Sequence, residues 1–191
     1  MSIVLVGSTS GSITLQEPAV AGSTVLDLPA VSGTILTTTS PKAGNVLQVV
    51  QSVKSTLQSL SISSGVYQDI SGLSVSITPT SSSSKILVLV NIGACGTSST
   101  ADIIFRINRD ATVIGTGSGA SYNATTANRS LNSELTSTPA MTFLDSPATT
   151  SATTYKVTGS IPDNLTLTIN GRQADSAFCS ISTITVMEIA A

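Results

Sequence analysis

Three observations predict an all-β protein folded as a β-sandwich or a small barrel. Apolar residues gather in short runs that are separated by turn clusters rich in Ser, Pro, Gly, Asn and Asp. Ser and Thr account for 61 of the 191 residues, and Thr together with the abundant Val and Ile favours strands over helices. No stretch combines helical periodicity with capping residues at both ends. Short strands without intervening helices are typical of a sandwich or a barrel.

The expected strands follow from alternating or continuous apolar runs. Residues 45–63 could form an amphipathic helix, but their Val, Ser and Thr content favours one long strand. Residues 73–77 alternate strictly between apolar and polar, and residues 85–94 form a nearly continuous apolar run. Four further strands are expected at residues 103–108, 154–161, 165–170 and 178–189.

The polar segment 115–135 is predicted to be a long loop. In a compact sandwich, a loop of this length is usually functional or ordered by a partner. Tyr122 could place an aromatic ring at a surface contact, whereas Tyr67 and Tyr155 adjoin expected strands and are predicted at the edge of the core. The candidate residues for surface recognition in this loop are Tyr122, Asn123, Asn128 and Arg129.

Residues 1–43 differ from the rest of the chain. They hold three of the seven prolines and no aromatic residue, and the eleven residues SITLQEPAVAG (12–22) are followed at once by the similar STVLDLPAVSG (23–33). Each copy runs from a short apolar stretch to a turn between Pro and Gly. Two copies are too few for a self-sufficient repeat domain. We therefore expect an N-terminal segment, 1–43, that pairs with other copies or with a different protein, and a main β-domain, 44–191.

Composition narrows the possible functions. Charged residues make up 9% of the chain, the net charge is −2 and the basic residues are scattered, which argues against nucleic acid as a partner. No apolar stretch approaches the length of a membrane span, and no secretory signal is recognised at the N-terminus. The sequence contains no histidine and no spaced pair of acids within one motif, so we expect no catalytic residue, cofactor or metal. Cys95 and Cys179 are expected as buried free thiols within strands, with a disulfide as the alternative.

Two stretches carry a family resemblance. Residues 13–36, ITLQEPAVAGSTVLDLPAVSGTIL, are similar to a segment near the N-termini of tailed-bacteriophage virion proteins, especially tail-fibre-like ones. Residues 67–94 resemble the opening of a distal β-domain in such proteins, with Ile70-Ser-Gly-Leu73, then Ile77-Thr-Pro79, a Ser-rich turn and an apolar strand from Lys85. The closing run FCSISTITVMEI also matches this family. The resemblance implies a jelly-roll head like those of tumour necrosis factor and complement C1q, assembled as a homotrimer.

The resemblance also gives the repeated segment a role. Three copies could wrap around one axis and bury each other's aliphatic rows, since a buried aliphatic side chain contributes roughly 1.5–3 kcal/mol. The residues expected to form this shared core are Ile13, Leu15, Val20, Val25, Leu26, Leu28 and Val31. Alternatively, the segment adds strands to another virion protein as an anchor.

These expectations favour a short homotrimeric fibre located in the virion. Its N-terminus would dock on another virion protein, and its head would contact a host-surface glycan or protein. The alternative is a trimeric capsid decoration protein that stabilises the shell. An enzyme acting on surface polysaccharide is disfavoured by the missing histidine and acid pair, and a bacterial surface adhesin by the lack of a recognised export signal.

Overall fold

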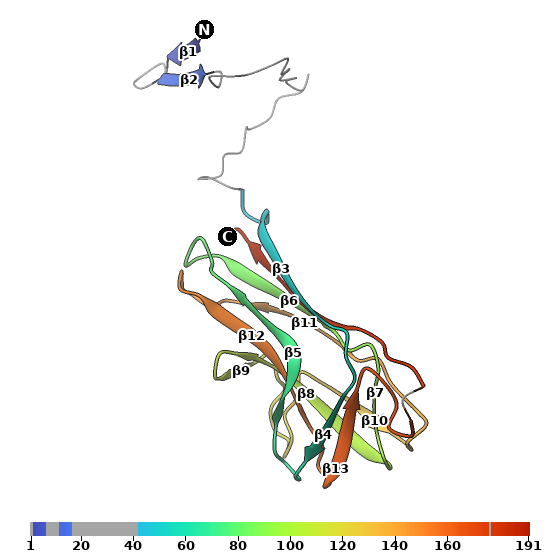
Figure 1. Cartoon of the computed structure of the whole chain (residues 1–191). Coiled ribbons are helices and arrows are strands. Elements are labelled where there is room, and N and C mark those ends of the chain that lie inside the picture. The colour runs from blue at the N-terminus through green and yellow to red at the C-terminus, as the bar shows by residue number, and fades with distance from the viewer. Residues whose placement is uncertain (1, 7–11, 17–41, 176) are drawn as a thin grey trace. The chain divides into compact units, whose positions relative to one another are not determined.

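The computed structural model describes residues 2–6, 12–16, 42–175 and 177–191 (Figure 1). The chain divides into two compact units, Met1–Leu36 and Thr37–Ala191. In the first unit, β1 (Ser2–Val6) and β2 (Ser12–Gln16) form a two-stranded antiparallel sheet. A sheet of two strands is marginally stable in water without further packing.

The described residues contain strands and no helix, which confirms the predicted all-β class. Within its described residues, the second unit holds twelve strands, all paired antiparallel in three sheets. These strands are β3 (Val46–Lys54), β4 (Gln58–Ile62), β5 (Gln68–Ile77), β6 (Lys85–Asn91), β7 (Cys95–Thr97), β8 (Ala101–Arg109), β9 (Thr112–Ile114), β10 (Thr126–Ser130), β11 (Ala140–Asp145), β12 (Thr153–Ser160), β13 (Leu165–Ile169) and β14 (Ser182–Ile189).

Two four-stranded ladders build the sandwich. Sheet 1 has the order β11-β6-β14-β3, and sheet 2 has the order β10-β8-β12-β5, with β9 also pairing with β8. In chain order, the eight strands of these two ladders pair first with last, second with seventh, third with sixth and fourth with fifth. This nested pairing is the strand order of a jelly roll. Sheet 3, β4-β13-β7, extends one end of the sandwich.

The core lies between sheets 1 and 2 and is filled by alternate residues of their strands. Ile86, Val88 and Val90 of β6 are buried, as are Leu73 and Val75 of β5. Figure 1 shows β5 and β12 crossing the molecule in one layer and β3, β6 and β11 in the other. The same alternation leaves every second residue on an outer face, so the outer surfaces of the two sheets can be derived from the strand register.

Five local features differ from the expectations. Residues 45–63 are extended as expected, but they form two strands, β3 and β4. Residues 55–57 between them do not belong to a strand. The segment 115–135 is not one loop, since it contains β10, which pairs with β8. Strand β11 was not predicted, and the closing strand β14 begins at Ser182 rather than Phe178. Tyr155 is fully buried in the core rather than at its edge.

Candidate functional site

A continuous apolar row crosses the outer face of sheet 1. Met187 on β14 is the register partner of both Val49 on β3 and Leu87 on β6, and Leu87 is in turn the partner of Leu144 on β11. Val49 is 55% exposed and Leu144 is 54% exposed, while the two central residues are partly buried by their neighbours. We call these four residues the apolar row. It spans all four strands of the sheet.

The surroundings of the apolar row carry almost no charge. Val53 adds another exposed aliphatic side chain, and the amide of Gln51 donates a hydrogen bond to Thr185 Oγ1 at 2.8 Å. In the described strands of sheet 1, Lys85 is the one charged residue that alternation places on this face. It lies at the margin, where Nζ donates to Ser146 Oγ at 2.8 Å. The face therefore offers an uncharged apolar surface to a partner.

The outer face of sheet 2 has the opposite character. Its polar groups satisfy one another across neighbouring strands, both at the exposed ion pairs and at the buried pair of Asn108 with Thr158. The cross-strand pairs are Asp69 with Lys156 at 2.8 Å, Asp102 with Arg129 at 2.9 Å, and Asn108 with Thr158 at 3.0 Å. The two outer faces of the sandwich thus differ in chemistry, one apolar and one polar.

Four residues from three segments meet over sheet 2. Arg106 of β8 stacks on the ring of Tyr67, with its guanidinium carbon 3.5 Å from the ring centroid, and its Nε donates to the carbonyl of Asn123 at 2.7 Å. Tyr122 lies against Gly65, where an added Cβ would be 3.6 Å from the phenol oxygen. We call Tyr67, Arg106, Tyr122 and Asn123 the Arg106 cluster. Burial raises the pKa of the Tyr67 phenol, against the opposing effect of the neighbouring guanidinium.

The loop that carries Tyr122 and Asn123 is tied to β8. The backbone amide of Thr125 donates to the carbonyl of Phe105 at 2.9 Å, and its hydroxyl accepts a hydrogen bond from the amide of Ile107 at 3.1 Å. Gly117 closes the loop by donating to the carbonyl of Ala124 at 3.2 Å. The two candidate recognition residues are therefore held in place over the outer face of sheet 2.

The other two candidate recognition residues lie elsewhere. Asn128 is half-buried, and its side-chain amide donates to Ser137 Oγ at 2.5 Å. Arg129 is exposed and ion-paired with Asp102. The structure therefore brings Tyr122 and Asn123 together and separates them from Asn128, whose described contacts tie β10 to the segment before β11.

The residues proposed for N-terminal assembly are only partly described. Ile13 and Leu15 lie in β2, opposite Leu5 and Ile3 of β1. Val20, Val25, Leu26, Leu28 and Val31 lie outside the described residues.

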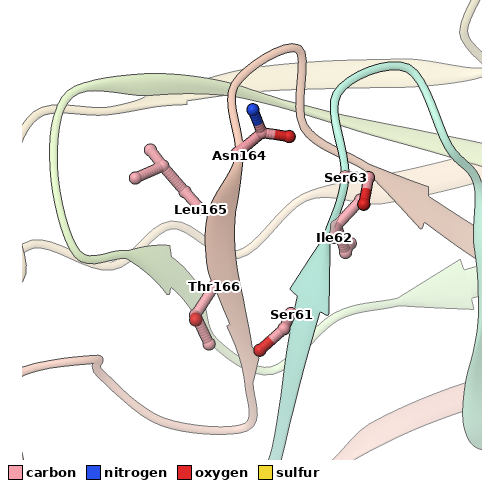
Figure 2. A pocket seen from close by; sticks show the side chains of 6 residues that line it. All are labelled: Ser61, Ile62, Ser63, Asn164, Leu165 and Thr166. Carbon is pink, nitrogen blue, oxygen red and sulfur yellow. The ribbon is translucent and has the colours of Figure 1, made fainter.

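A shallow hollow of about 250 Å³ lies where β4 ends and β13 begins (Figure 2). Its lining residues are Ser61, Ile62, Ser63, Asn164, Leu165 and Thr166. Figure 2 shows the two serine hydroxyls and the Asn164 amide on adjacent strand ends, with Leu165 pointing away from them. Asn164 also fixes the turn that follows β4, because its Oδ1 accepts a hydrogen bond from the backbone amide of Ser64 at 2.8 Å. We call this the β4–β13 hollow.

A smaller hollow of about 160 Å³ lies beside β10. It is lined by Cys95, Arg129, Ser130, Leu131, Leu135, Thr136 and Ser137. The Cys95 thiol is buried, and burial raises its pKa to about 11, so it is a poor nucleophile. Both cysteines are free, and Cys179 is exposed rather than buried as expected, because it precedes β14 instead of lying within it.

The described residues offer binding surfaces more clearly than catalytic machinery. No group of three metal-ligating side chains from His, Cys, Asp and Glu gathers within the described ranges. Among the described residues, no helix is long and apolar enough to cross a membrane. The β4–β13 hollow supplies hydroxyl and amide groups, which suit hydrogen bonding to a polar ligand.

Sequence reasoning missed the apolar row, Tyr67 and Arg106 as functional candidates. Arg106 could have been noticed, because it is a lone charge in the apolar run 103–108 and alternation places it opposite the core residues. The apolar row required the strand register, which the sequence does not supply.

No protein-family model matches the chain, and no curated protein shows significant sequence similarity to it. The structure shows the fold class of the protein, an antiparallel β-sandwich with the strand order of a jelly roll. In this protein, one outer face of the sandwich is apolar and the other is polar. Jelly rolls serve many unrelated functions, so any functional conclusion rests on these surfaces.

Proposed function

We propose that the protein is a non-enzymatic structural protein of a tailed-bacteriophage virion, in which three copies assemble into a short fibre. The heads pack through the outer faces of sheet 1, the N-terminal segment attaches to another virion protein, and the polar loops face the host surface. The attachment and the virion location are supported by the resemblance of residues 13–36 and 67–94 to tail-fibre-like proteins.

The contrast between the two outer faces carries the assembly part of this proposal. Val49 and Leu144 are exposed at the two ends of the apolar row on sheet 1. On the outer face of sheet 2, the charged side chains instead form the ion pairs Arg129–Asp102 and Lys156–Asp69. Burying half of an aliphatic side chain contributes about 1 kcal/mol, so several such side chains from each copy support association. An uncharged face also meets a copy of itself without like-charge repulsion.

Charges introduced into the apolar row test the assembly. Val49→Asp combined with Leu144→Asp alters exposed side chains, so the fold is retained while a buried contact between copies is broken. Light scattering should show a trimer for the unaltered protein and a monomer for the double variant. Ser74→Asp places one carboxylate on the exposed outer face of sheet 2 and should leave the trimer intact, and so should distinguish added charge as such from charge on sheet 1. A double variant that remains trimeric would overturn this assignment.

A capsid decoration protein is the alternative for the same trimer. The two functions differ in what the head binds: a fibre head binds host cells, whereas a decoration protein binds empty capsids. Sedimentation of the purified trimer with each of these targets separates the two. Binding to capsids without binding to cells would replace the fibre with the decoration protein.

A further inference from the structure

Arg106 differs from the other arginines in the described part of the chain. Arg109 is paired with Asp145, Arg129 with Asp102, and Arg172 with Glu134 and Asp175. Within the described residues, Arg106 has no carboxylate within ion-pair distance. Its guanidinium instead stacks on Tyr67, and its Nε is used by the carbonyl of Asn123. The charge is thus held in a fixed orientation without being neutralised.

The neighbours of Arg106 on sheet 2 do not compensate this charge. Its register partner on β12 is Thr158, whose hydroxyl donates to Asn108, and the next residue in the same cross-strand row is Asp69. Asp69 is two strands away, about 10 Å at normal strand spacing, and its carboxylate is bound to Lys156. The face around Arg106 therefore carries a local positive charge on a chain whose net charge is −2.

The hydrogen-bonding groups of the Arg106 cluster suit an anion. A guanidinium that uses Nε internally still presents its two terminal nitrogens, and such a planar fork matches the oxygens of a carboxylate or a phosphate. Asn123 accepts a hydrogen bond from Ala120 through Oδ1, which leaves its NH₂ group as a donor. The ring of Tyr122 beside this group provides an aromatic surface with a polar tip.

The β4–β13 hollow adjoins the same turn. Ser63 lines the hollow, and Gly65, two residues further along the chain, contacts Tyr122 of the Arg106 cluster. Two residues span at most about 7 Å, so the turn places Ser63 of the hollow close to the Gly65 that contacts Tyr122 of the cluster. The turn between them is fixed at both sides, by Asn164 bound to Ser64 and by the amide of Gly65 bound to the carbonyl of Ile161.

We propose that the Arg106 cluster and the β4–β13 hollow together bind an acidic sugar. Arg106 takes the carboxylate or phosphate of the sugar, and Ser63 and Asn164 bind sugar hydroxyls. This inference rests on the proposed function in that it gives the outward-facing head a ligand class, but it predicts nothing about oligomeric state. The trimer test and the binding test therefore fail independently.

The binding test uses the intact protein and four probes: a disaccharide containing glucuronic acid, glucose 6-phosphate, glucose and inorganic phosphate. The chain has four arginines, so its Nε–H signals are few in a nitrogen-labelled sample, and Arg106→Gln identifies the one of interest. The glucuronic acid disaccharide or the sugar phosphate at millimolar concentration should shift the Arg106 signal. Because the chain has no tryptophan, tyrosine fluorescence gives a second readout of Tyr67 and Tyr122.

Matched variants separate the site from general charge effects. Arg106→Gln should weaken binding roughly tenfold or more, as expected for the loss of a charged hydrogen-bonded contact. Arg172→Gln removes an arginine that is ion-paired with Glu134 and Asp175 and belongs to neither the cluster nor the hollow, and it should leave binding unchanged. Ser63→Ala should weaken binding of the disaccharide but not of inorganic phosphate.

Each remaining result has a defined meaning. Preference for the disaccharide over glucose 6-phosphate identifies a carboxylate sugar, and the reverse preference identifies a phosphate sugar; both support the site. Equal binding of glucose would overturn the role of Arg106. If inorganic phosphate bound as tightly as either acidic sugar, the site would hold an adventitious ion only. No shift of the Arg106 signal with any probe would overturn the site altogether.

Discussion

Both carboxylate oxygens of Asp145 accept hydrogen bonds from Nη1 of Arg109 at 2.9 Å. Asp145 ends β11 of sheet 1 and Arg109 ends β8 of sheet 2, so this ion pair joins the two layers of the sandwich. Tyr155 completes the arrangement from β12 by donating its hydroxyl to Asp145 Oδ2 at 2.7 Å. Burial and the adjacent carboxylate raise the pKa of Tyr155 well above its usual value, so its proton stays available for this bond.

Replacing Asp145 should lower the free energy of unfolding more than replacing one of its hydrogen-bond partners does. Asp145→Ala leaves the buried hydroxyl and the Arg109 charge without their acceptor, and it should lower the free energy of unfolding by about 3 kcal/mol. Tyr155→Phe removes a single hydroxyl and should cost about 1 kcal/mol. Urea unfolding at neutral pH measures both. Equal losses for the two variants would show that Asp145 does not connect the layers as described.

Glu188 should give the protein a stability that is lost in acid. Burial alone would raise the pKa of this carboxyl, but hydrogen bonds from Gln48 at 2.6 Å and from the amide and hydroxyl of Thr80 at 2.7 Å outweigh it and hold the pKa below its usual value. A carboxyl with a lowered folded-state pKa stabilises the fold above its unfolded pKa of about 4.3, and that contribution disappears as the pH falls through the folded pKa.

Comparison with Glu188→Gln isolates this effect. The unaltered protein should be the more stable of the two at pH 7, and the difference between their urea midpoints should shrink as the pH is lowered from 5 towards 2. The glutamine variant keeps the size of the side chain, so packing is matched. A difference that stays constant across this range would contradict the assignment.

The two cysteines should differ sharply in reactivity. Cys179 is exposed, whereas Cys95 is buried and has its pKa raised to about 11. Native protein treated with iodoacetamide at pH 8 should gain one adduct, at Cys179, and protein in urea should gain two. Peptide mass spectrometry locates the adduct, and Cys179→Ser provides the control that should stay unmodified when folded. Rapid modification of Cys95 in the native protein would contradict its burial.

Asn170 should tolerate glycine better than alanine. It follows β13 with a positive φ of 67°, is fully buried, and its side-chain amide donates to the carbonyls of Lys54 at 2.9 Å and Thr56 at 3.1 Å. Asn170→Gly and Asn170→Ala both remove these hydrogen bonds. Only alanine is also strained in the left-handed conformation at this position, by about 1–2 kcal/mol. Asn170→Gly should therefore be the more stable variant by about 1 kcal/mol in thermal or urea unfolding. The reverse order would mean that backbone strain is unimportant here.

The fold was predictable from the sequence where one face of a strand is apolar and the other polar. Residues 73–77 alternate strictly and became part of β5, and the apolar run from Lys85 became β6. Strand β11 was not predicted because its apolar and polar residues do not alternate clearly. Met141 lies in the core, but Leu144 on the opposite face is also apolar. Strand β10 has Ala127 as its one apolar residue, so only its pairing with β8 defines it.

The candidate site was predictable only in part. Tyr122 and Asn123 stood out because an aromatic ring and an amide lay in a long polar segment. Their partners Tyr67 and Arg106 are distant in the chain, and stacking between them depends on how β8 and the turn before β5 meet in three dimensions. The apolar row likewise joins Val49 to Leu144 through strands whose order no local pattern encodes.

The mass of the protein in solution tests the central claim most directly. Light scattering on a size-exclusion column should be applied to the full chain and to residues 42–191, which contain all of sheets 1, 2 and 3. If the outer face of sheet 1 drives assembly, the full chain should have three times its mass of 19.3 kDa, and the shorter form should also be a trimer. A shorter form that is monomeric at every concentration would contradict assembly through sheet 1.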